Sequence, residues 1–251
     1  MGFFNHKTDG MFRKVEQITY SSGDYPWTWT YRVNYYIAKY FTYIFWKANV
    51  TPNIVTILGA LVNVIAVSLL IWKVNALNIY WVITIGLIWQ IGFSLDCADG
   101  SLARLTGKTS RFGAWFDLAI DFINHSLFIF GIFFLILKTS ENNMTNGGYW
   151  MYFISFAFCL SVNLLLLFSS NIKKIIFNKE EKILPQDVFK FLEIIRYTIP
   201  LILDYGTLLF IVTIFLKFPN ALFYAINIYS LIVFLSILGT GFMLYRNYYK
   251  S

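Results

Sequence analysis

The stretch LDCADGSLARLTGKTSRFGAWFDLAID, residues 95–121, places four aspartates between two strongly apolar segments. These aspartates are Asp96, Asp99, Asp117 and Asp121. An ionised carboxylate at the centre of a membrane helix costs about 2.5–3.5 kcal/mol on insertion scales, so four would cost on the order of 10 kcal/mol without compensation. Divalent cations compensate such charge most directly, and the stretch therefore predicts a metal site in a membrane protein.

The composition of the whole chain agrees with a membrane location. The 251 residues are 58% hydrophobic and 20% aromatic, and only 13% are charged, whereas about 25% is usual in a soluble domain. The abundant aromatic residues suit lipid-facing surfaces and the belts at membrane interfaces. The two cysteines, Cys97 and Cys159, lie in or beside apolar runs, which favours small packing residues over a disulfide.

The hydropathy pattern predicts an all-α integral membrane protein with six transmembrane helices. A span needs about 20 apolar residues, and the expected spans are residues 53–73, 78–98, 113–137, 149–170, 202–217 and 221–245. Residues 31–50 combine aromatic and basic side chains, which is typical of an amphipathic helix lying in the interface and equally of a short helix packed against the spans. Residues 186–197 form a second segment of this kind.

The positive charges predict the orientation of these spans. All Lys and Arg residues except Lys73, Lys138 and Lys217 fall in segments that lie on one side of the six-span arrangement. The positive-inside rule places that side, with both termini and the aspartates, in the cytoplasm. The net charge of +7 is therefore explained by topology and by attraction to membrane lipids, and no nucleic-acid partner is expected.

The spacing of the aspartates predicts that they converge. Asp96 and Asp99 are three residues apart at the end of the second span, and Asp117 and Asp121 are four apart at the start of the third. Each spacing puts two carboxylates on one helix face, and a tight turn would bring the faces together. Oxygen ligands without a His or Cys pattern favour Mg²⁺ or Mn²⁺, and four carboxylates can hold two such ions.

Two alternatives follow from the same residues. Carboxylates inside a membrane also line cation pathways, so a cation transporter is a second interpretation of the aspartates, although a transporter more often distributes its acids along a path.

Arg104, at the end of the second span, either binds a phosphate oxygen or extends to the interface. Gly100, Ala103 and Gly113 allow a helix or a flat ligand to approach the backbone closely.

The aspartates and small residues together resemble a family signature. The stretch matches the pattern of the CDP-alcohol phosphatidyltransferase family at every fixed position. The matching residues are Asp96, Asp99, Gly100, Ala103, Arg104, Gly113, Asp117 and Asp121. Thr51-Pro52-Asn53 with Thr56 also resembles the way in which this family begins its first span. The resemblance covers about residues 31–246, so residues 1–30 are expected to form a separate cytoplasmic segment before a membrane domain of residues 31–251.

The resemblance implies a reaction and a set of metal ligands. A CDP-linked lipid, usually CDP-diacylglycerol, transfers its phosphatidyl group to an alcohol and releases CMP in phospholipid biosynthesis. Asp96, Asp99 and Asp117 are implied to bind metal, and Asp121 to complete the second metal position and act as general base. A homodimer is also implied.

The resemblance further implies which residues contact the nucleotide. Five of these residues belong to the signature, and one lies at the start of the first span. The residues expected to face the cytidine diphosphate are Asn53, Asp99, Gly100, Ala103, Arg104 and Gly113.

Several residues bear on the identity of the acceptor alcohol. Family members that use glycerol phosphate or inositol phosphate commonly carry a basic residue directly after the last aspartate, where this chain has Phe122. Candidate acceptor contacts are Lys173, Lys174, Arg196 and His125, although the three basic residues also fit topology charges, and the histidine also fits core packing.

We expect inositol, inositol phosphate or another small polyol as acceptor, ahead of glycerol 3-phosphate and serine. The stretch also has a limited similarity to choline and ethanolamine phosphotransferases, which place the lipid on the acceptor instead of the CDP-linked donor. A degenerate scaffold is disfavoured because no signature residue is missing.

Overall fold

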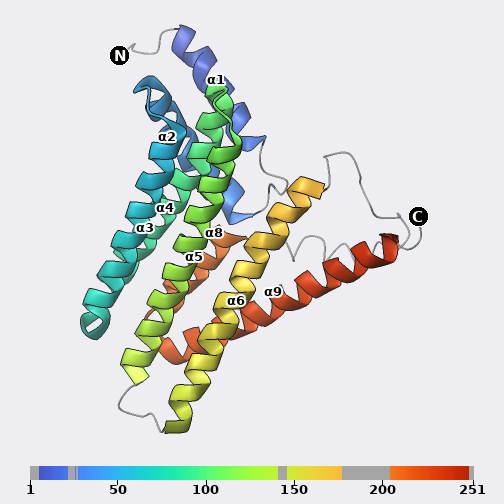
Figure 1. Cartoon of the computed structure of the whole chain (residues 1–251). Helices are drawn as coiled ribbons and strands as arrows, with labels where there is room; N and C mark the ends of the chain where they lie inside the picture. The colour runs from blue at the N-terminus through green and yellow to red at the C-terminus, as the bar shows by residue number, and fades with distance from the viewer. Residues whose placement is uncertain (1–5, 22–25, 27, 141–145, 177–203, 249–251) are drawn as a thin grey trace.

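The computed structural model describes residues 6–21, 26, 28–140, 146–176 and 204–248. Every regular element in these ranges is a helix, as the hydropathy pattern predicts. Figure 1 shows these elements in chain order: α1 (His6–Tyr20), the short π-helix η1 (Thr30–Asn34), α2 (Tyr35–Lys47), α3 (Pro52–Lys73), the short 3₁₀-helix η2 (Val74–Ala76), α4 (Ile79–Thr106), α5 (Arg111–Ser140), α6 (Asn146–Ile176), α8 (Tyr205–Phe215) and α9 (Pro219–Tyr248).

Five helical segments of the described chain are long and apolar enough to cross a membrane. They are Pro52–Ala76, Ile79–Thr106, Arg111–Ser140, Gly148–Leu167 and Pro219–Leu238. They correspond to five of the six expected spans. The remaining one, expected at residues 202–217, is represented by α8, whose 11 described residues extend about 16 Å and are shorter than a bilayer core.

Helix α3 packs along both α4 and α5, and these three helices form the centre of the molecule (Figure 1). Helix α2 packs along α4, and α1 contacts both α2 and α4. On the other side of this centre, α8 packs on α4, while α6 and α9 pack on α5 and on each other. The chain therefore brings the start of α3, the end of α4 and the start of α5 to one end of the bundle, which is also the end nearest α1.

The surface of the bundle is strongly apolar. Leu61, Leu87 and Phe153 are each more than half exposed, which in water would be an aggregation hazard but in a membrane is the lipid-facing surface. Because lipid is as apolar as these side chains, the helices associate by close packing and polar contacts instead of by a hydrophobic driving force.

Glycines provide that close packing between the central helices. A Cβ added at Gly59 of α3 would lie 3.2 Å from the carbonyl oxygen of Gly92 and 3.5 Å from the backbone nitrogen of Asp96. A Cβ at Gly86 of α4 would overlap the Cγ2 atom of Thr213 in α8. A larger residue at either position would collide with the neighbouring helix and push it away, so these glycines determine how near α3 and α8 lie to α4.

Two features differ from the expected boundaries. Helix α4 continues to Thr106 instead of ending near residue 98, so Asp96 and Asp99 lie inside the helix. The segment before residue 31, expected only as a cytoplasmic extension, contains helix α1, which is packed on α2. The second interfacial segment, residues 186–197, lies outside the described residues.

Candidate metal and nucleotide site

A four-residue turn connects α4 to α5 and makes the two helices antiparallel. Gly107 ends α4 in the left-handed conformation, with φ of 65°, a region that glycine adopts without steric cost. The N–H of Lys108 donates to the carbonyl of Ala103 at 3.0 Å. Ser110 then caps α5, because its hydroxyl oxygen accepts the N–H of Gly113 at 2.9 Å.

Three of the four aspartates meet beside this turn. Single carboxylate oxygens of Asp96, Asp99 and Asp117 all lie within 4.8 Å of one another. Asp99 is only 5% exposed, whereas Asp96 is half-buried. The convergence that the spacing predicts is therefore present for these three residues. Asp121 lies one helical turn further along α5 and is not part of this close group.

The depth of the group in the membrane follows from the aromatic residues at the opposite end of the bundle. The Lys73 ammonium lies over the rings of Trp72, at 3.5 Å, and Trp81, at 4.7 Å, a combination typical of a membrane interface. Asp99 follows Trp81 by eighteen residues on the same helix, a distance of about 27 Å. A bilayer core is about 30 Å thick, so the three carboxylates lie close to the other interface, where charge costs much less than at the midplane.

Helix α3 supplies a direct partner to the group. The Thr56 hydroxyl donates a hydrogen bond to Oδ2 of Asp99, and Thr56 itself is 4% exposed. The hydroxyl also lies 3.2 Å from the carbonyl oxygen of Pro52. A donor of this kind holds a buried carboxylate in one orientation and stabilises its charged form. The sequence pattern at the start of the first span contains Thr56, but it did not indicate this contact.

Helix α2 holds the same region from the other side. The Thr42 hydroxyl donates to the carbonyl oxygen of Ala98 at 3.3 Å, between the two aspartates of α4. Asn34, at the end of η1 just before α2, makes similar contacts. Its side-chain amide donates to Oε1 of Gln90 at 2.9 Å and to the Ser94 hydroxyl at 3.1 Å, both on α4 before Ala98. These buried polar contacts inside the bundle were not predicted, because single Asn, Gln and Thr residues in apolar segments do not reveal which helix they face.

The small residues of the signature lie beside polar side chains of α3 and α4. A Cβ added at Gly113 would lie 3.7 Å from Oδ1 of Asn53, so α3 and α5 approach each other there. A Cβ added at Gly100 would lie 3.3 Å from Nη1 of Arg104. Arg104 donates from Nη2 to the Ser101 hydroxyl at 3.3 Å. Asn53 and Gly113 are thus neighbours, and the Arg104 side chain lies along the surface that Gly100 leaves open.

The predicted acceptor residues are divided between described and undescribed parts of the chain. His125 is 7% exposed and stacks on Tyr205 of α8 with a ring separation of 4.0 Å. Lys173 and Lys174 lie on α6, but their side chains are outside the described residues, as is the whole of Arg196. Asp204 caps α8, because its Oδ2 accepts the N–H of Thr207 at 2.8 Å.

The residues present fit a hard divalent cation. The three close ligand atoms are all carboxylate oxygens, the donor type that Mg²⁺ and Mn²⁺ prefer, and thiolate or imidazole ligands are not among them. The hydrogen bond that the buried Thr56 hydroxyl donates to Asp99 is the kind of supporting contact that orients a metal-binding carboxylate.

Comparison with known proteins places the chain in a family. A family model described as CDP-alcohol phosphatidyltransferase matches residues 49–238. The chain is also 40% identical over 84 residues to the archaetidylinositol phosphate synthase of Pyrococcus horikoshii, an alignment that covers 34% of this chain and 41% of that enzyme. The chain thus spans less than half the length of this relative. The family match covers most of the chain, so the protein belongs to the CDP-alcohol phosphatidyltransferase family.

Proposed function

We propose that the protein transfers a phosphatidyl-type group from a CDP-linked lipid to a small polyol, with an inositol phosphate as the favoured acceptor, and releases CMP. The observation that carries this proposal is the cluster of Asp96, Asp99 and Asp117 inside a chain that matches the family over residues 49–238. The carboxylates lie at one end of a membrane bundle, where a soluble nucleotide and a lipid can meet.

The metal assignment rests on the geometry of the close group. Asp96, Asp99 and Asp117 would hold one Mg²⁺ or Mn²⁺, and Asp121 would complete a second position together with members of the same group. Divalent cations at these positions would neutralise the charge of the diphosphate and of the leaving CMP. The signature includes Asp121 at the spacing that puts it on the same face of α5 as Asp117.

The chain itself would position the nucleotide. Gly100 and Gly113 leave room for the cytidine diphosphate to approach the backbones of α4 and α5. Ala103, three residues after Gly100, lies on the same face of α4. Asn53 lies beside Gly113, and Arg104 lies beside Gly100. Both side chains carry N–H donors, and the Arg104 guanidinium can give two parallel hydrogen bonds to phosphate oxygens.

Asp121 is the proposed general base. The acceptor hydroxyl oxygen forms a bond to the lipid-linked phosphorus, the bond from that phosphorus to the bridging diphosphate oxygen breaks, and CMP leaves with this oxygen. The hydroxyl proton passes to the Asp121 carboxylate. A positioned base of this kind contributes about 10²–10⁴-fold to the rate.

The acceptor assignment has support from the relative. Its printed name denotes synthesis of archaetidylinositol phosphate, a lipid that carries an inositol phosphate. The same name supports an archaetidyl group as one form of the transferred group, beside phosphatidyl. Phe122 cannot supply the basic contact that inositol phosphate enzymes commonly have at this position, so we assign that role to Lys173, Lys174 and Arg196, with His125 at the buried end of the site.

The orientation follows from the distribution of positive charge. The site lies at the end of the bundle whose connecting segments contain most Lys and Arg residues, which supports a cytoplasmic active site. CDP-linked lipid and soluble acceptor would then reach the aspartates from the same side. We also propose a homodimer, as the family resemblance implies.

The direct test is release of CMP by the purified protein in detergent micelles. CDP-diacylglycerol and CDP-archaeol are each supplied with inositol 1-phosphate, inositol, glycerol 3-phosphate or serine, in the presence of Mg²⁺, Mn²⁺ or a chelator. We expect metal-dependent release with inositol 1-phosphate. Release with a different acceptor would correct the substrate but keep the class of reaction.

Variants separate catalysis from cation transport. Asp121→Asn should remove CMP release while thermal unfolding stays like that of the unmodified protein. Metal flux into proteoliposomes in the absence of any CDP-linked substrate, combined with no CMP release for any donor and acceptor pair, would contradict the proposal and favour a transporter.

A further inference from the structure

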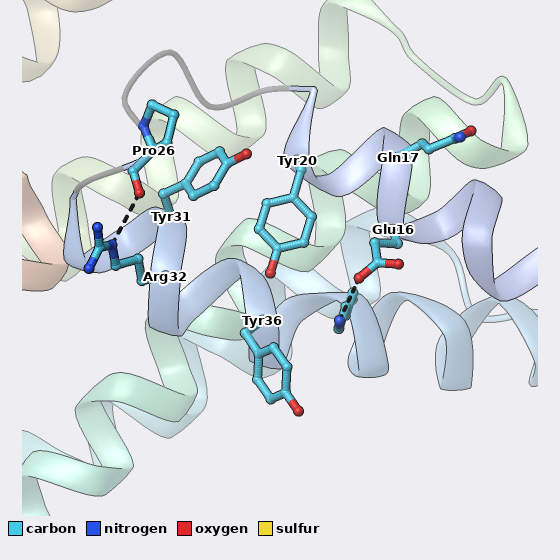
Figure 2. Close-up of a pocket in the computed structure, with 8 residues that line it drawn as sticks. Glu16, Gln17, Tyr20, Pro26, Tyr31, Arg32 and Tyr36 are labelled. Carbon is cyan, nitrogen blue, oxygen red and sulfur yellow. Dashed lines mark hydrogen bonds and ion pairs between the residues drawn. The ribbon is translucent and has the colours of Figure 1, made fainter.

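A second polar site lies between α1 and α2, outside the aspartate cluster. A pocket of about 640 Å³ opens there. Figure 2 shows the side chains on its walls, and those that bear on its chemistry are Glu16, Tyr20, Tyr31, Arg32, Tyr36 and Lys39. The nucleotide and metal residues described above do not line it. The pocket is therefore distinct from the site proposed for the transfer reaction.

Lys39 is a buried cation on the wall of this pocket. Its side chain is 8% exposed, and its ammonium lies 2.7 Å from Oε1 of Glu16. The ammonium also lies 4.5 Å from the centre of the Tyr36 ring. Burial by itself would lower the pKa of Lys39, but the hydrogen bond and the charge of Glu16 outweigh it, and the net pKa is raised. Lys39 therefore remains charged, and it holds α1 against α2.

Arg32 makes the pocket positive overall. The lining contains two cations, Arg32 and Lys39, and one carboxylate, Glu16. The Arg32 side chain is exposed, and its Nε–H donates to the carbonyl oxygen of Pro26 at 3.3 Å (Figure 2). This bond uses one of the five N–H donors of the guanidinium. A guanidinium held by its Nε–H presents its remaining N–H groups in the planar arrangement that matches two phosphate oxygens.

Tyrosines supply neutral donors beside these cations. Tyr20 of α1 and Tyr31 of η1 are in contact, with ring centres 4.9 Å apart. Burial raises the pKa of Tyr20, so its hydroxyl remains protonated and able to donate at neutral pH. The pocket thus combines a guanidinium, an ammonium and phenol hydroxyls, all of which bind anionic oxygens.

The position of α2 indicates which anion reaches the pocket. Tyr36, Tyr40 and Ile44 are 50%, 43% and 56% exposed, and their spacing of four residues places them along one stripe of the helix. A short helix with an exposed aromatic and aliphatic stripe and basic residues beside it lies in the membrane interface. Because Tyr36 belongs both to the stripe and to the pocket wall, the pocket opens at the level of the lipid head groups.

We propose that this pocket binds the phosphate of an anionic membrane lipid. The net positive lining selects against zwitterionic lipids, whose ammonium group would meet Arg32. The lipid tails would lie along the exposed stripe of α2, which a free phosphate ion has no means to use. The lipid would thereby hold the α1–α2 pair at the membrane surface.

The test is selective retention of lipid by the full-length protein. Purified protein in mild detergent is mixed with equal amounts of phosphatidylglycerol and phosphatidylcholine, and bound lipids are counted by native mass spectrometry. We expect preferential retention of phosphatidylglycerol. Arg32→Gln should lower the ratio of bound phosphatidylglycerol to phosphatidylcholine about fivefold, the factor expected for one basic residue near an anionic surface. Arg32→Lys should keep most of the preference.

Arg13→Gln is the matched control. It removes the same charge from an exposed position on α1 that does not line the pocket, so the lipid ratio should remain unchanged. An equal loss of preference in Arg13→Gln and Arg32→Gln would show diffuse surface attraction and overturn the proposal, as would an undiminished preference in Arg32→Gln. Displacement of phosphatidylglycerol by millimolar inorganic phosphate alone would also overturn it, because the lipid tails would then contribute nothing.

Discussion

Substitution of Thr56 by valine tests whether the aspartate cluster is organised by the helix beside it. Valine has nearly the shape of threonine but lacks the hydroxyl that donates to Oδ2 of Asp99. Thr56 and Asp99 are almost fully buried, with exposures of 4% and 5%, so water cannot easily replace the lost donor. The change therefore removes one supporting contact of a proposed metal ligand and leaves the packing of α3 against α4 in place.

The expected magnitude follows from the charge of the acceptor. A hydrogen bond to a charged group contributes about 1.5–3 kcal/mol, which corresponds to a factor of about 10–150 in an equilibrium constant. Loss of a contact that orients a metal ligand typically weakens metal affinity by about 10–100-fold. We therefore expect Thr56→Val to raise the Mn²⁺ concentration for half-maximal binding by about tenfold or more.

Two readouts measure this shift independently. Electron paramagnetic resonance reports free Mn²⁺ and gives the binding affinity without substrate, while CMP release against free Mn²⁺ gives the concentration for half-maximal activity. Thr56→Ser keeps the hydroxyl and should restore both values. Thr139→Val is a matched control, because the Thr139 hydroxyl donates to carbonyls of its own helix at the other end of α5.

A change of less than twofold in Mn²⁺ affinity for Thr56→Val, with unchanged thermal unfolding, would refute the reasoning. Asp99 would then be oriented without help from α3. Equal weakening by Thr139→Val would attribute the effect to general loosening of the bundle.

Three further predictions concern the close aspartate group, the turn after α4 and the α1–α2 contact. Asp117→Asn should lower CMP release by at least 10²-fold and weaken Mn²⁺ binding, because it removes a charged ligand from the close group; full activity would exclude Asp117 as a ligand. Gly107→Ala should destabilise the protein by about 1 kcal/mol, a fall in Tm of about 2–4 °C, because φ is 65° there, whereas Gly10→Ala, in open space on α1, should not lower Tm. Because the folded-state pKa of Lys39 is raised by Glu16, the stability from their ion pair should be complete and constant between neutral pH, where Glu16 is ionised, and about pH 10.5. It should be lost as pH rises through the folded pKa of Lys39, and proteolysis of α1 followed from neutral to alkaline pH measures this loss.

Much of the fold follows from local composition. Five of the expected spans appear as helices of sufficient length, because long apolar segments in lipid satisfy their backbone hydrogen bonds only as helices. Their ends were harder to place. Helix α4 extends to Thr106, since a polar surface near the interface does not stop a helix, and the end is set by the left-handed Gly107. Helix α1 was missed because its segment is neither strongly apolar nor part of the family pattern.

By itself, the sequence determined the class of protein and the identity of the aspartates. Carboxylates at helical spacing within apolar segments must be compensated, and the signature names the family in which they act. The tertiary structure decided which of them meet: Asp96, Asp99 and Asp117 form the close group, and Asp121 lies a turn away. It also revealed the Thr56 hydroxyl and the pocket between α1 and α2. Such contacts join residues far apart in the chain, and they depend on how closely and at what rotation the helices pack, which local spacing does not encode.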